Sequence, residues 1–246
     1  MTTARPDTDA SRSPRRAARQ PVRERGIQRQ ALLLDAVDDL LRSADPEDVG
    51  IYQIAERAKV APASVYHFFP TREAAFVALA QRYLAEFRRL GEQPAEASRL
   101  KSWQDYFEIE QARVSAAFND SPPALRIFLG YAGAAVRNFG ARFNTEMTTG
   151  VFDALDRLFH MPHVADPQRR FGIAHAVMEA VWTQAYLQDG RITEECRQDA
   201  LEAHRVYCRL FLPERVEPRD WVRTAAERGE AIGFLRAPDT AKPSAL

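Results

Sequence analysis

The segment that decides the fold runs from Ile51 to Phe76 and reads IYQIAERAKVAPASVYHFFPTREAAF. Its apolar residues recur at helical spacing on either side of the short turn Lys59–Ala61, which predicts two short helices joined at an angle. Pro62 suits the first turn of the second helix, because a proline there removes no helical hydrogen bond. Pro70 ends that helix, and Thr71 is placed to cap a third. We therefore expect a helix-turn-helix unit.

The second helix of this unit has one apolar side and one polar side. The apolar side carries Val65, Phe68 and Phe69, and the other side carries Ser64, Tyr66 and His67. In a helix-turn-helix unit the second helix can enter the DNA major groove while the first crosses the backbone. The pattern therefore indicates a protein that binds duplex DNA.

The same stretch resembles the DNA-binding signature of the TetR family of transcriptional regulators. The resemblance rests on the pattern Ile54-Ala55-Glu56-Arg57-Ala58-x-Val60, followed by Ser64-Val65-Tyr66-x-x-Phe69-Pro70-x-Arg72-Glu73. Three positions depart from it: Lys59 stands where a glycine is usual, Phe68 where His or Tyr is common, and Gly50 where a threonine usually caps the first helix. We expect a strained turn, the loss of one phosphate donor and a weaker cap.

The resemblance implies that Tyr66 donates to a phosphate, that His67 contacts DNA beside it, and that Arg72 holds a phosphate at the start of the third helix. Ala63 and Ser64 are small enough to let the backbone approach the groove. The full candidate set is Tyr52, Lys59, Ala63, Ser64, Tyr66, His67, Thr71 and Arg72. The alternative is that Tyr66 is a half-buried core tyrosine and Arg72 a surface charge.

The chain has 246 residues, a formal net charge of zero and 46% hydrophobic residues, which suits one large domain or two small ones. This balance argues against a generally polycationic binder, whereas DNA binding depends on where the charge lies. Residues 1–24 are rich in arginine and almost free of large apolar side chains. They are predicted to be a disordered basic arm, either simply solvated or following DNA phosphates.

The two cysteines, Cys196 and Cys208, lie twelve residues apart on one predicted helix, so they do not pair within the chain. A reducing compartment is the simplest interpretation. The sequence has no apolar run long enough for a membrane span and no secretory signal pattern. We expect a cytoplasmic protein.

The periodicity predicts an all-α fold with four parts. After the arm, residues 25–90 form a helix-turn-helix domain with a connecting helix, and residues 91–213 form a larger helical domain for effector binding and dimerisation. Residues 214–246 are a tail with one short helix. The break at 91–98, which contains Pro94, marks the domain boundary.

The larger domain is rich in aromatic residues, and such a domain can enclose an apolar pocket with a few polar groups. The candidate effector-binding residues are Trp103, Phe107, Tyr131, Phe143, His175, Met178, Glu179 and Trp182. The alternative for each is ordinary core. His175 and Glu179 share a helix face, but two ligands do not make a metal site, so neither a metal nor a cofactor is expected.

The resemblance also implies a homodimer through the last two helices, at about 166–188 and 193–212. Their small and apolar stripe suits either a dimer interface or a core. It consists of Ala174, Val177, Val181, Ala185, Leu201, His204, Cys208 and Phe211.

These features predict a homodimeric, ligand-responsive transcriptional regulator. We expect a repressor that a small molecule releases from a palindromic double-stranded DNA operator. One alternative is an activator of the same fold, and another is an architectural DNA-binding protein with an inert dimerisation domain. An enzyme is not favoured, because the sequence shows no nucleophile–base pair, glycine-rich phosphate loop or metal cluster.

Overall fold

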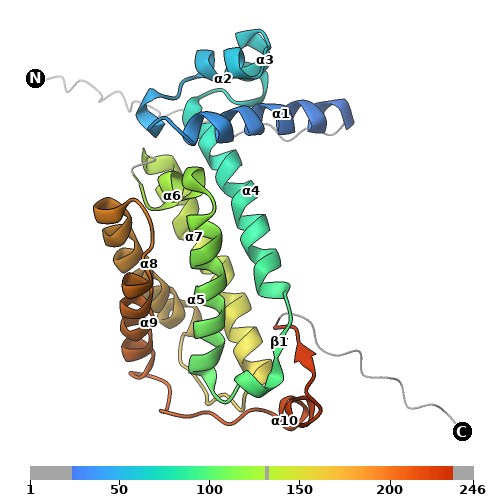
Figure 1. The fold of residues 1–246 in the computed structure, drawn as a ribbon, viewed down its shortest axis with the longest axis vertical. Helices are drawn as coiled ribbons and strands as arrows, with labels where there is room; N and C mark the ends of the chain where they lie inside the picture. Colours follow the sequence, from blue (N-terminus) through green and yellow to red (C-terminus); the bar gives the residue numbers. More distant parts are fainter. Residues whose placement is uncertain (1–23, 131–132, 235–246) are drawn as a thin grey trace, which may run out of the picture.

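The computed structural model describes residues 24–130 and 133–234, and leaves out the side chains of residues 92, 141–147 and 149. Over these residues the fold is all-α apart from one pair of two-residue strands. Figure 1 shows a small head set across one end of an elongated helical body, with α4 running from the head down one side of the body. The predicted fold class is confirmed.

The head contains α1 (Glu24–Leu41), the short 3-10 helix η1 (Pro46–Asp48), α2 (Ile51–Arg57) and α3 (Pro62–Phe68). The helix pair predicted around the turn at residues 59–61 is thus confirmed. Pro62 lies in the first turn of α3, as expected. Gly50 precedes α2 and provides no side-chain cap, which agrees with the predicted weakness there.

The turn between α2 and α3 places Lys59 in the left-handed region, with φ of 53°. A residue with a Cβ is disfavoured there, whereas glycine is not. The strain predicted for this turn is therefore present in the backbone.

The connecting helix α4 (Arg72–Glu92) begins at the predicted cap, because the Thr71 hydroxyl accepts a hydrogen bond from the backbone N–H of Ala74 at 3.2 Å. It packs against α1 in the head and against α5, α6 and α7 in the body. A single continuous helix therefore belongs to both parts of the molecule.

The body consists of α5 (Trp103–Asn119), α6 (Pro122–Phe128), α7 (Gly133–Leu158), α8 (Pro167–Asp189) and α9 (Glu194–Cys208). The helices α8 and α9 are extensively packed against one another, and α7 lies against α8. The Thr193 hydroxyl caps α9 by accepting from the Cys196 N–H, as the sequence predicts.

Residues after 213 are more than a tail. The helix α10 (Asp220–Glu227) packs against η2 (Ala97–Arg99), and β2 (Ala231–Ile232) pairs antiparallel with β1 (Ala95–Glu96). Phe234 is fully buried in a second cluster of apolar residues, here called the lower core, which also contains Trp103, Leu155 and Phe171. The described part of the predicted tail therefore closes the far end of the body, and the small strand pair was not expected.

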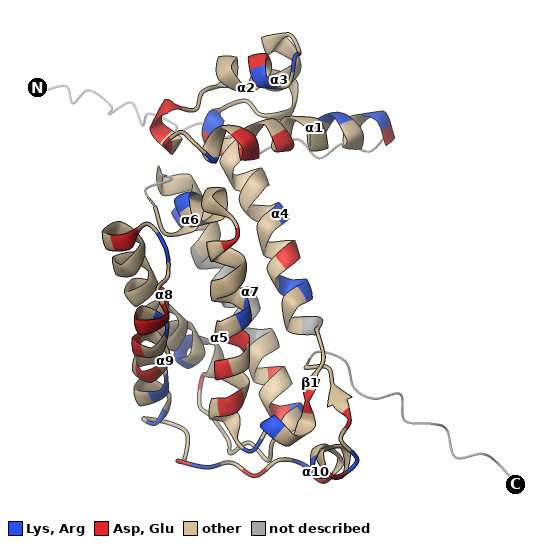
Figure 2. Cartoon of the chain, viewed as in Figure 1, with Lys and Arg blue, Asp and Glu red and all other residues tan. Residues whose placement is uncertain are grey.

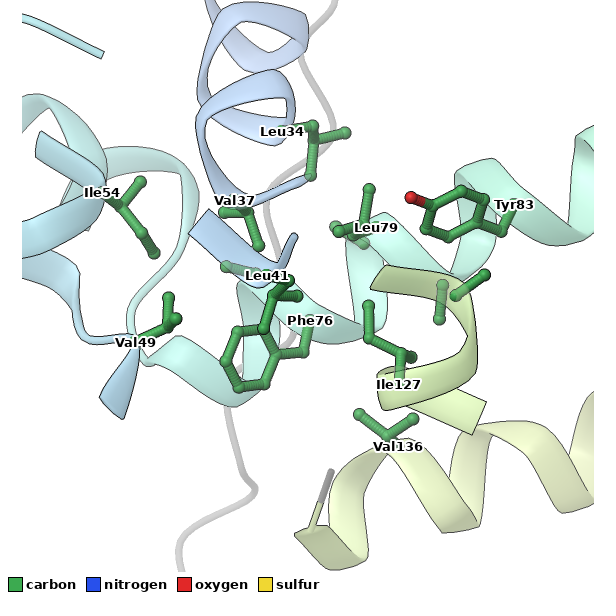
Figure 3. Packing of buried hydrophobic residues seen from close by; sticks show 14 of the residues in the cluster. Leu34, Val37, Leu41, Val49, Ile54, Phe76, Leu79, Tyr83, Ile127 and Val136 are labelled. Atoms are coloured by element: carbon green, nitrogen blue, oxygen red, sulfur yellow. The ribbon is translucent and has the colours of Figure 1, made fainter. Parts of the chain in front are cut away.

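The upper core is continuous from the head into the body. Leu41 of α1, Leu79 of α4 and Ile127 of α6 belong to the same buried cluster (Figure 3). Because densely packed interiors transmit strain, a displacement of α6 would change the packing at the end of α1. No helix in the described ranges has both the length and the apolar character that a membrane span requires.

Candidate DNA-binding surface and interior cavity

The outer face of the α2–α3 pair carries the side chains that the sequence predicts for DNA contact. Tyr52 is 68% exposed and Tyr66 is 46% exposed, and both are large aromatic residues that would ordinarily be covered. Lys59 and His67 are also exposed, Ala63 is exposed, and Ser64 is half-buried. The exposure of Tyr66 argues against a core role for this tyrosine.

The opposite face of α3 holds the helix in place. Val65 and Phe69 are fully buried, and Phe68 is 7% exposed. The departure at Phe68 therefore changes the packing of the head and leaves its outer face unaltered, so the expected loss of a phosphate donor does not follow from it.

Arg72 is held by its own chain. Its guanidinium donates to the backbone carbonyl of Glu47 at 2.7 Å, and its Nε donates to the carboxylate of Glu73 at 3.0 Å. The bond to Glu47 ties the start of α4 to η1, which precedes α2. Thr71 is exposed, but its hydroxyl is occupied as the helix cap.

The head, taken together with the connecting helix α4, is not basic. Residues 24–92 contain nine Lys and Arg against eleven Asp and Glu, a formal net charge of −2. Figure 2 shows acidic and basic residues mixed along α1 and a red patch at the loop before α2. Several arginines are paired with acids, among them Arg57 with Asp39 at 2.9 Å. The outer face of α2 and α3 therefore presents hydroxyl groups, one imidazole and one lysine. It does not present a concentrated positive charge.

The body encloses a cavity of about 390 Å³ between α4, α5, α6, α7, α8 and α9. A volume of this size is typical of sites for small organic molecules. Its walls are mainly aromatic, and the aromatic lining residues are Phe87, Tyr106, Phe107, Phe118, Phe128, Phe171 and Trp182. Phe118 lies between two of these aromatic residues: its ring centroid is 4.8 Å from that of Phe87 and 6.0 Å from that of Trp182.

Several buried polar atoms at the cavity wall lack a hydrogen-bond partner among the described residues. They are Oε1 and Nε2 of Gln111, Oε1 of Glu110 and Nε1 of Trp182. Gln111 is 4% exposed and Trp182 is 2% exposed. Because buried polar groups in folded proteins almost always have partners, each such atom calls for one beyond the described residues, and a ligand in the cavity can provide it.

Burial also shifts the titration of the groups around the cavity. It raises the pKa of Glu110 to about 7, and the charge of Arg113 offsets only part of this rise. It lowers the pKa of His204 to about 3, and the neighbouring His175 and Arg205 act in the same direction. Burial lowers the pKa of His175 as well, against the pull of the Glu179 carboxylate. Both imidazoles are therefore neutral near pH 7.

Five of the eight predicted effector residues line the cavity: Phe107, His175, Met178, Glu179 and Trp182. Trp103 lies elsewhere, fully buried in the lower core, where its indole N–H donates to the carbonyl of Pro213 at 2.9 Å. Tyr131 and the side chain of Phe143 lie outside the described residues. No group of three metal-ligating side chains gathers within the described ranges.

Glu110, Gln111 and His204 also line the cavity and were not predicted from the sequence to do so. The available signal was the position of Gln111 on α5, where it interrupts the apolar spacing of Phe107, Val114 and Phe118. A polar residue on an apolar helix face is a departure from the usual pattern of a core helix.

The stripe on the last two helices mostly faces inward. Ala174, Ala185, Leu201 and Cys208 are essentially inaccessible and His204 is 3% exposed, all within one protomer. The large exposed apolar residues are instead Leu187 of α8 at 67%, Val206 of α9 at 54%, and Leu210 in the turn after α9 at 72%. A dimer formed by α8 and α9 would therefore use a different face from the one that the stripe suggests.

Comparison with known families identifies the head. Residues 33–79 match the family model described as bacterial regulatory proteins of the tetR family, and this match covers the second half of α1, all of α2 and α3, and the start of α4. No curated protein matches the chain.

Solved structures with a similar fold include a TetR-family transcriptional regulator from Streptomyces coelicolor, with a TM-score of 0.55, 22% identity, and coverage of 75% of this chain and 98% of that chain. A TetR transcriptional regulator from a Rhodococcus species gives a TM-score of 0.53, 20% identity, and coverage of 76% and 97%. The fatty acid degradation regulator FadR from Bacillus halodurans gives a TM-score of 0.52, 13% identity, and coverage of 73% and 94%. The body, like the head, thus shares its fold with such regulators.

Proposed function

We propose that the chain, whose residues 33–79 match the tetR family model, is a member of the TetR family of bacterial transcriptional regulators, and that it is a homodimeric repressor released from its operator by a small molecule. The family and the fold make it a DNA-binding regulator. The observation that carries the finer proposal is the cavity of about 390 Å³ with unpartnered buried polar atoms, since an inert dimerisation domain has no need of one.

DNA contact is proposed for the exposed face of α2 and α3. Tyr66 and Tyr52 would donate their hydroxyls to phosphates, and Ala63 and Ser64 would meet the base edges at the front of α3. Lys59 and His67 would complete the surface. Arg72 would act mainly by fixing the start of α4, because its donors already bind Glu47 and Glu73.

The charge of the head gives the arginine-rich arm a role in this proposal. Non-specific attraction to DNA comes from neutralised phosphates, and the head with α4 (residues 24–92) has a formal net charge of −2. Residues 1–23, which lie outside the described ranges, contain six arginines and two aspartates. We propose that this arm neutralises the phosphates that the head cannot, in preference to its other interpretation as a merely solvated tail.

The dimer is proposed to form through the outer faces of α8 and α9. Leu187, Val206 and Leu210 are large apolar side chains left exposed there, and burying them against a second copy would remove them from water. Two heads in such a dimer would bind half-sites about 34–36 Å apart, so the operator is expected to be nearly palindromic.

The experiment begins with selection of bound duplexes from a random pool by the full chain. Affinity for the selected operator is then measured at several salt concentrations, for the natural protein and for a variant with Arg12, Arg15, Arg16 and Arg19 changed to alanine. We expect a palindromic operator, and a salt slope that falls by roughly 0.9 for each phosphate that the variant no longer neutralises. An unchanged slope would refute the role of the arm, and no enrichment of any duplex would refute DNA recognition itself.

Placing the selected operator upstream of a reporter separates repression from activation. Repression predicts that the intact protein lowers expression and that deletion of its gene raises it. Activation predicts the reverse for the same operator.

A further inference from the structure

One face of α5 forms a wall of the cavity. Phe107, Gln111, Val114 and Phe118 all line it, and their spacing of four, three and four residues places them along a single side of the helix. Gln111 is the polar member of this otherwise apolar row. Within this row, the Gln111 amide is the polar group, and the other three side chains offer a ligand only apolar contact.

The Gln111 amide is equipped for a ligand. Both Nε2 and Oε1 are without a hydrogen-bond partner in the described part of the chain, and the residue is 4% exposed. An amide in this state offers one donor group and one acceptor at the same point. In the empty protein, water can satisfy such atoms, and a ligand gains affinity only if it replaces those bonds.

Two further atoms at the wall repeat this chemistry. The indole Nε1 of Trp182 is a donor, and Oε1 of Glu110 is an acceptor when the carboxyl group is ionised. Both are buried and unpartnered among the residues that the structure describes. The cavity thus presents donors and acceptors together, within aromatic walls that suit a flat ring.

The formal charges at the wall select against acids. Among the described lining residues there is one permanent cation, Arg88, against two carboxyl groups, Glu110 and Glu179. His175 and His204 do not add positive charge, because burial keeps both imidazoles neutral at pH 7. A ligand carboxylate would lose its hydration on entering the cavity and would find no excess of positive charge there, so its binding would be unfavourable.

We propose that the effector is an uncharged molecule with aromatic rings and an amide-like group, whose carbonyl accepts from Gln111 and Trp182 and whose N–H donates to Gln111 or Glu110. This inference rests on the proposed function, since it takes the cavity to be the effector site. It goes further by assigning the chemical class of the effector and the residue that selects it.

Three probes of similar size test the proposal on the full-length protein. Benzanilide has two rings and a secondary amide, trans-stilbene has the same shape without polar atoms, and 4-biphenylcarboxylate is an acid. Binding is measured by calorimetry and by the shift in melting temperature. We expect benzanilide to bind about tenfold more tightly than stilbene, which corresponds to one or two net hydrogen bonds, and the acid to bind most weakly.

The variant Gln111→Leu assigns the selection to one side chain. It should bind benzanilide and stilbene equally, because the amide group is removed while the apolar wall remains. Its fold should persist, since an unpartnered buried amide is replaced by an apolar side chain. The matched control is Gln104→Leu on the same helix. Gln104 is not a lining residue and donates instead to the carbonyl of Glu214, so this variant should keep the tenfold preference.

Equal binding of benzanilide and stilbene by the natural protein would overturn the proposal, as would tightest binding of the acid or failure of all three probes to bind. A preference for benzanilide that survives in Gln111→Leu would overturn the assignment to Gln111. None of these results touches operator binding, which is measured separately on the selected duplex. Failure of the natural protein to bind that duplex would instead remove the proposed function.

Discussion

Arg126 of α6 donates a hydrogen bond to the backbone carbonyl of Arg42, just after the end of α1, at 2.9 Å. The same guanidinium nitrogen donates to the carbonyl of Leu41, the last residue of α1. Two and three residues further along, Phe128 and Leu129 line the cavity. A side chain within one turn of the cavity wall is thus bonded directly to the head.

This pair of hydrogen bonds gives the first prediction. Arg126→Ala should lower the free energy of unfolding by about 1.5 kcal/mol, because it removes a charged donor from one part-buried and one exposed hydrogen bond. It should also reduce the factor by which an effector weakens operator binding, since occupancy of the cavity would act on α1 only through the remaining core. The measurement is operator affinity with and without ligand, together with a thermal melt.

The control for Arg126 is Arg219→Ala. Arg219 also donates to a backbone carbonyl, that of Asp156 at 2.6 Å, but Asp156 lies on α7 in the body and neither residue lines the cavity. This variant should be less stable while keeping the effector response. An equally weakened response in both variants would show that general destabilisation, and not the bond to α1, is responsible.

A second prediction concerns the turn of the helix-turn-helix. Lys59 has a φ of 53°, a region in which a side chain with a Cβ is disfavoured. Lys59→Gly removes that cost, and the greater conformational freedom of glycine in the unfolded chain offsets part of the gain. The net expectation is that the head becomes more stable by about 1 kcal/mol. Thermal unfolding without DNA provides the test. Lys101→Gly, at a position outside the left-handed region, should give no such gain, and a lower melting temperature for Lys59→Gly would contradict the assignment of strain.

The head could be read from the sequence because its determinants are local. Pro62 and Thr71 mark helix starts within a few residues of the turn, and the apolar spacing of α2 and α3 needs no distant partner. The cavity is different. Gln111 and Trp182 lie on separate helices, and no local pattern says which buried polar atoms will be left without partners.

The last two helices show a second limit of sequence patterns. Leu201 and Leu210 are nine residues apart, about two and a half helical turns, so they point to opposite sides of α9 and its extension. Leu201 is 1% exposed and Leu210 is 72% exposed, so apolar residues stand on both the covered and the open side. Periodicity shows that a face is apolar but not whether the chain itself or a second copy covers it. Likewise Phe234 lies beyond every long predicted helix, and its burial depends on β2 pairing with β1.

Tyr66 provides a third prediction. Tyr66→Phe removes one exposed hydroxyl and keeps the ring, so it should weaken binding to every duplex by a similar factor of about threefold to tenfold. Binding to the operator and to single-base variants of it provides the measurement. Tyr207→Phe on α9, far from the head in sequence, should change nothing. A decrease confined to one base position would show that Tyr66 reads a base edge and not a phosphate.

The exposed apolar face gives a fourth prediction. Leu210→Asp, alone or with Val206→Asp, should shift the protein from dimer to monomer in sedimentation experiments, because a desolvated carboxylate would face the second copy. Operator affinity should fall with it, since two half-sites would no longer be bound together. Ile27→Asp makes the same change at an exposed apolar residue of α1 and should leave the dimer intact. Persistence of the dimer in the double variant would place the interface elsewhere.

The last prediction uses the titration of Glu110. Burial raises the pKa of this carboxyl group from 4.5 to about 7 in the folded protein. Between these two values the folded chain binds the proton more strongly than the unfolded chain does, so the free energy of unfolding falls as the pH rises, and the decrease is complete above pH 7. The difference in pKa corresponds to about 3 kcal/mol.

Glu110→Gln keeps the shape of the side chain and removes its charge. We therefore expect the melting temperature of this variant, relative to the natural protein, to rise steadily between pH 5 and pH 8. His204 acts in the opposite sense: its pKa is lowered to about 3 in the folded protein, so its contribution makes the free energy of unfolding fall as the pH falls. Because His204 is present in both proteins, this contribution cancels in the difference between them. Gln111→Leu, which changes a neighbouring polar group without changing a titratable one, should show a difference that does not vary with pH. A constant difference for Glu110→Gln over the same range would mean that the carboxyl group is ionised in the folded protein at little cost, and that the cavity is more polar than its walls indicate.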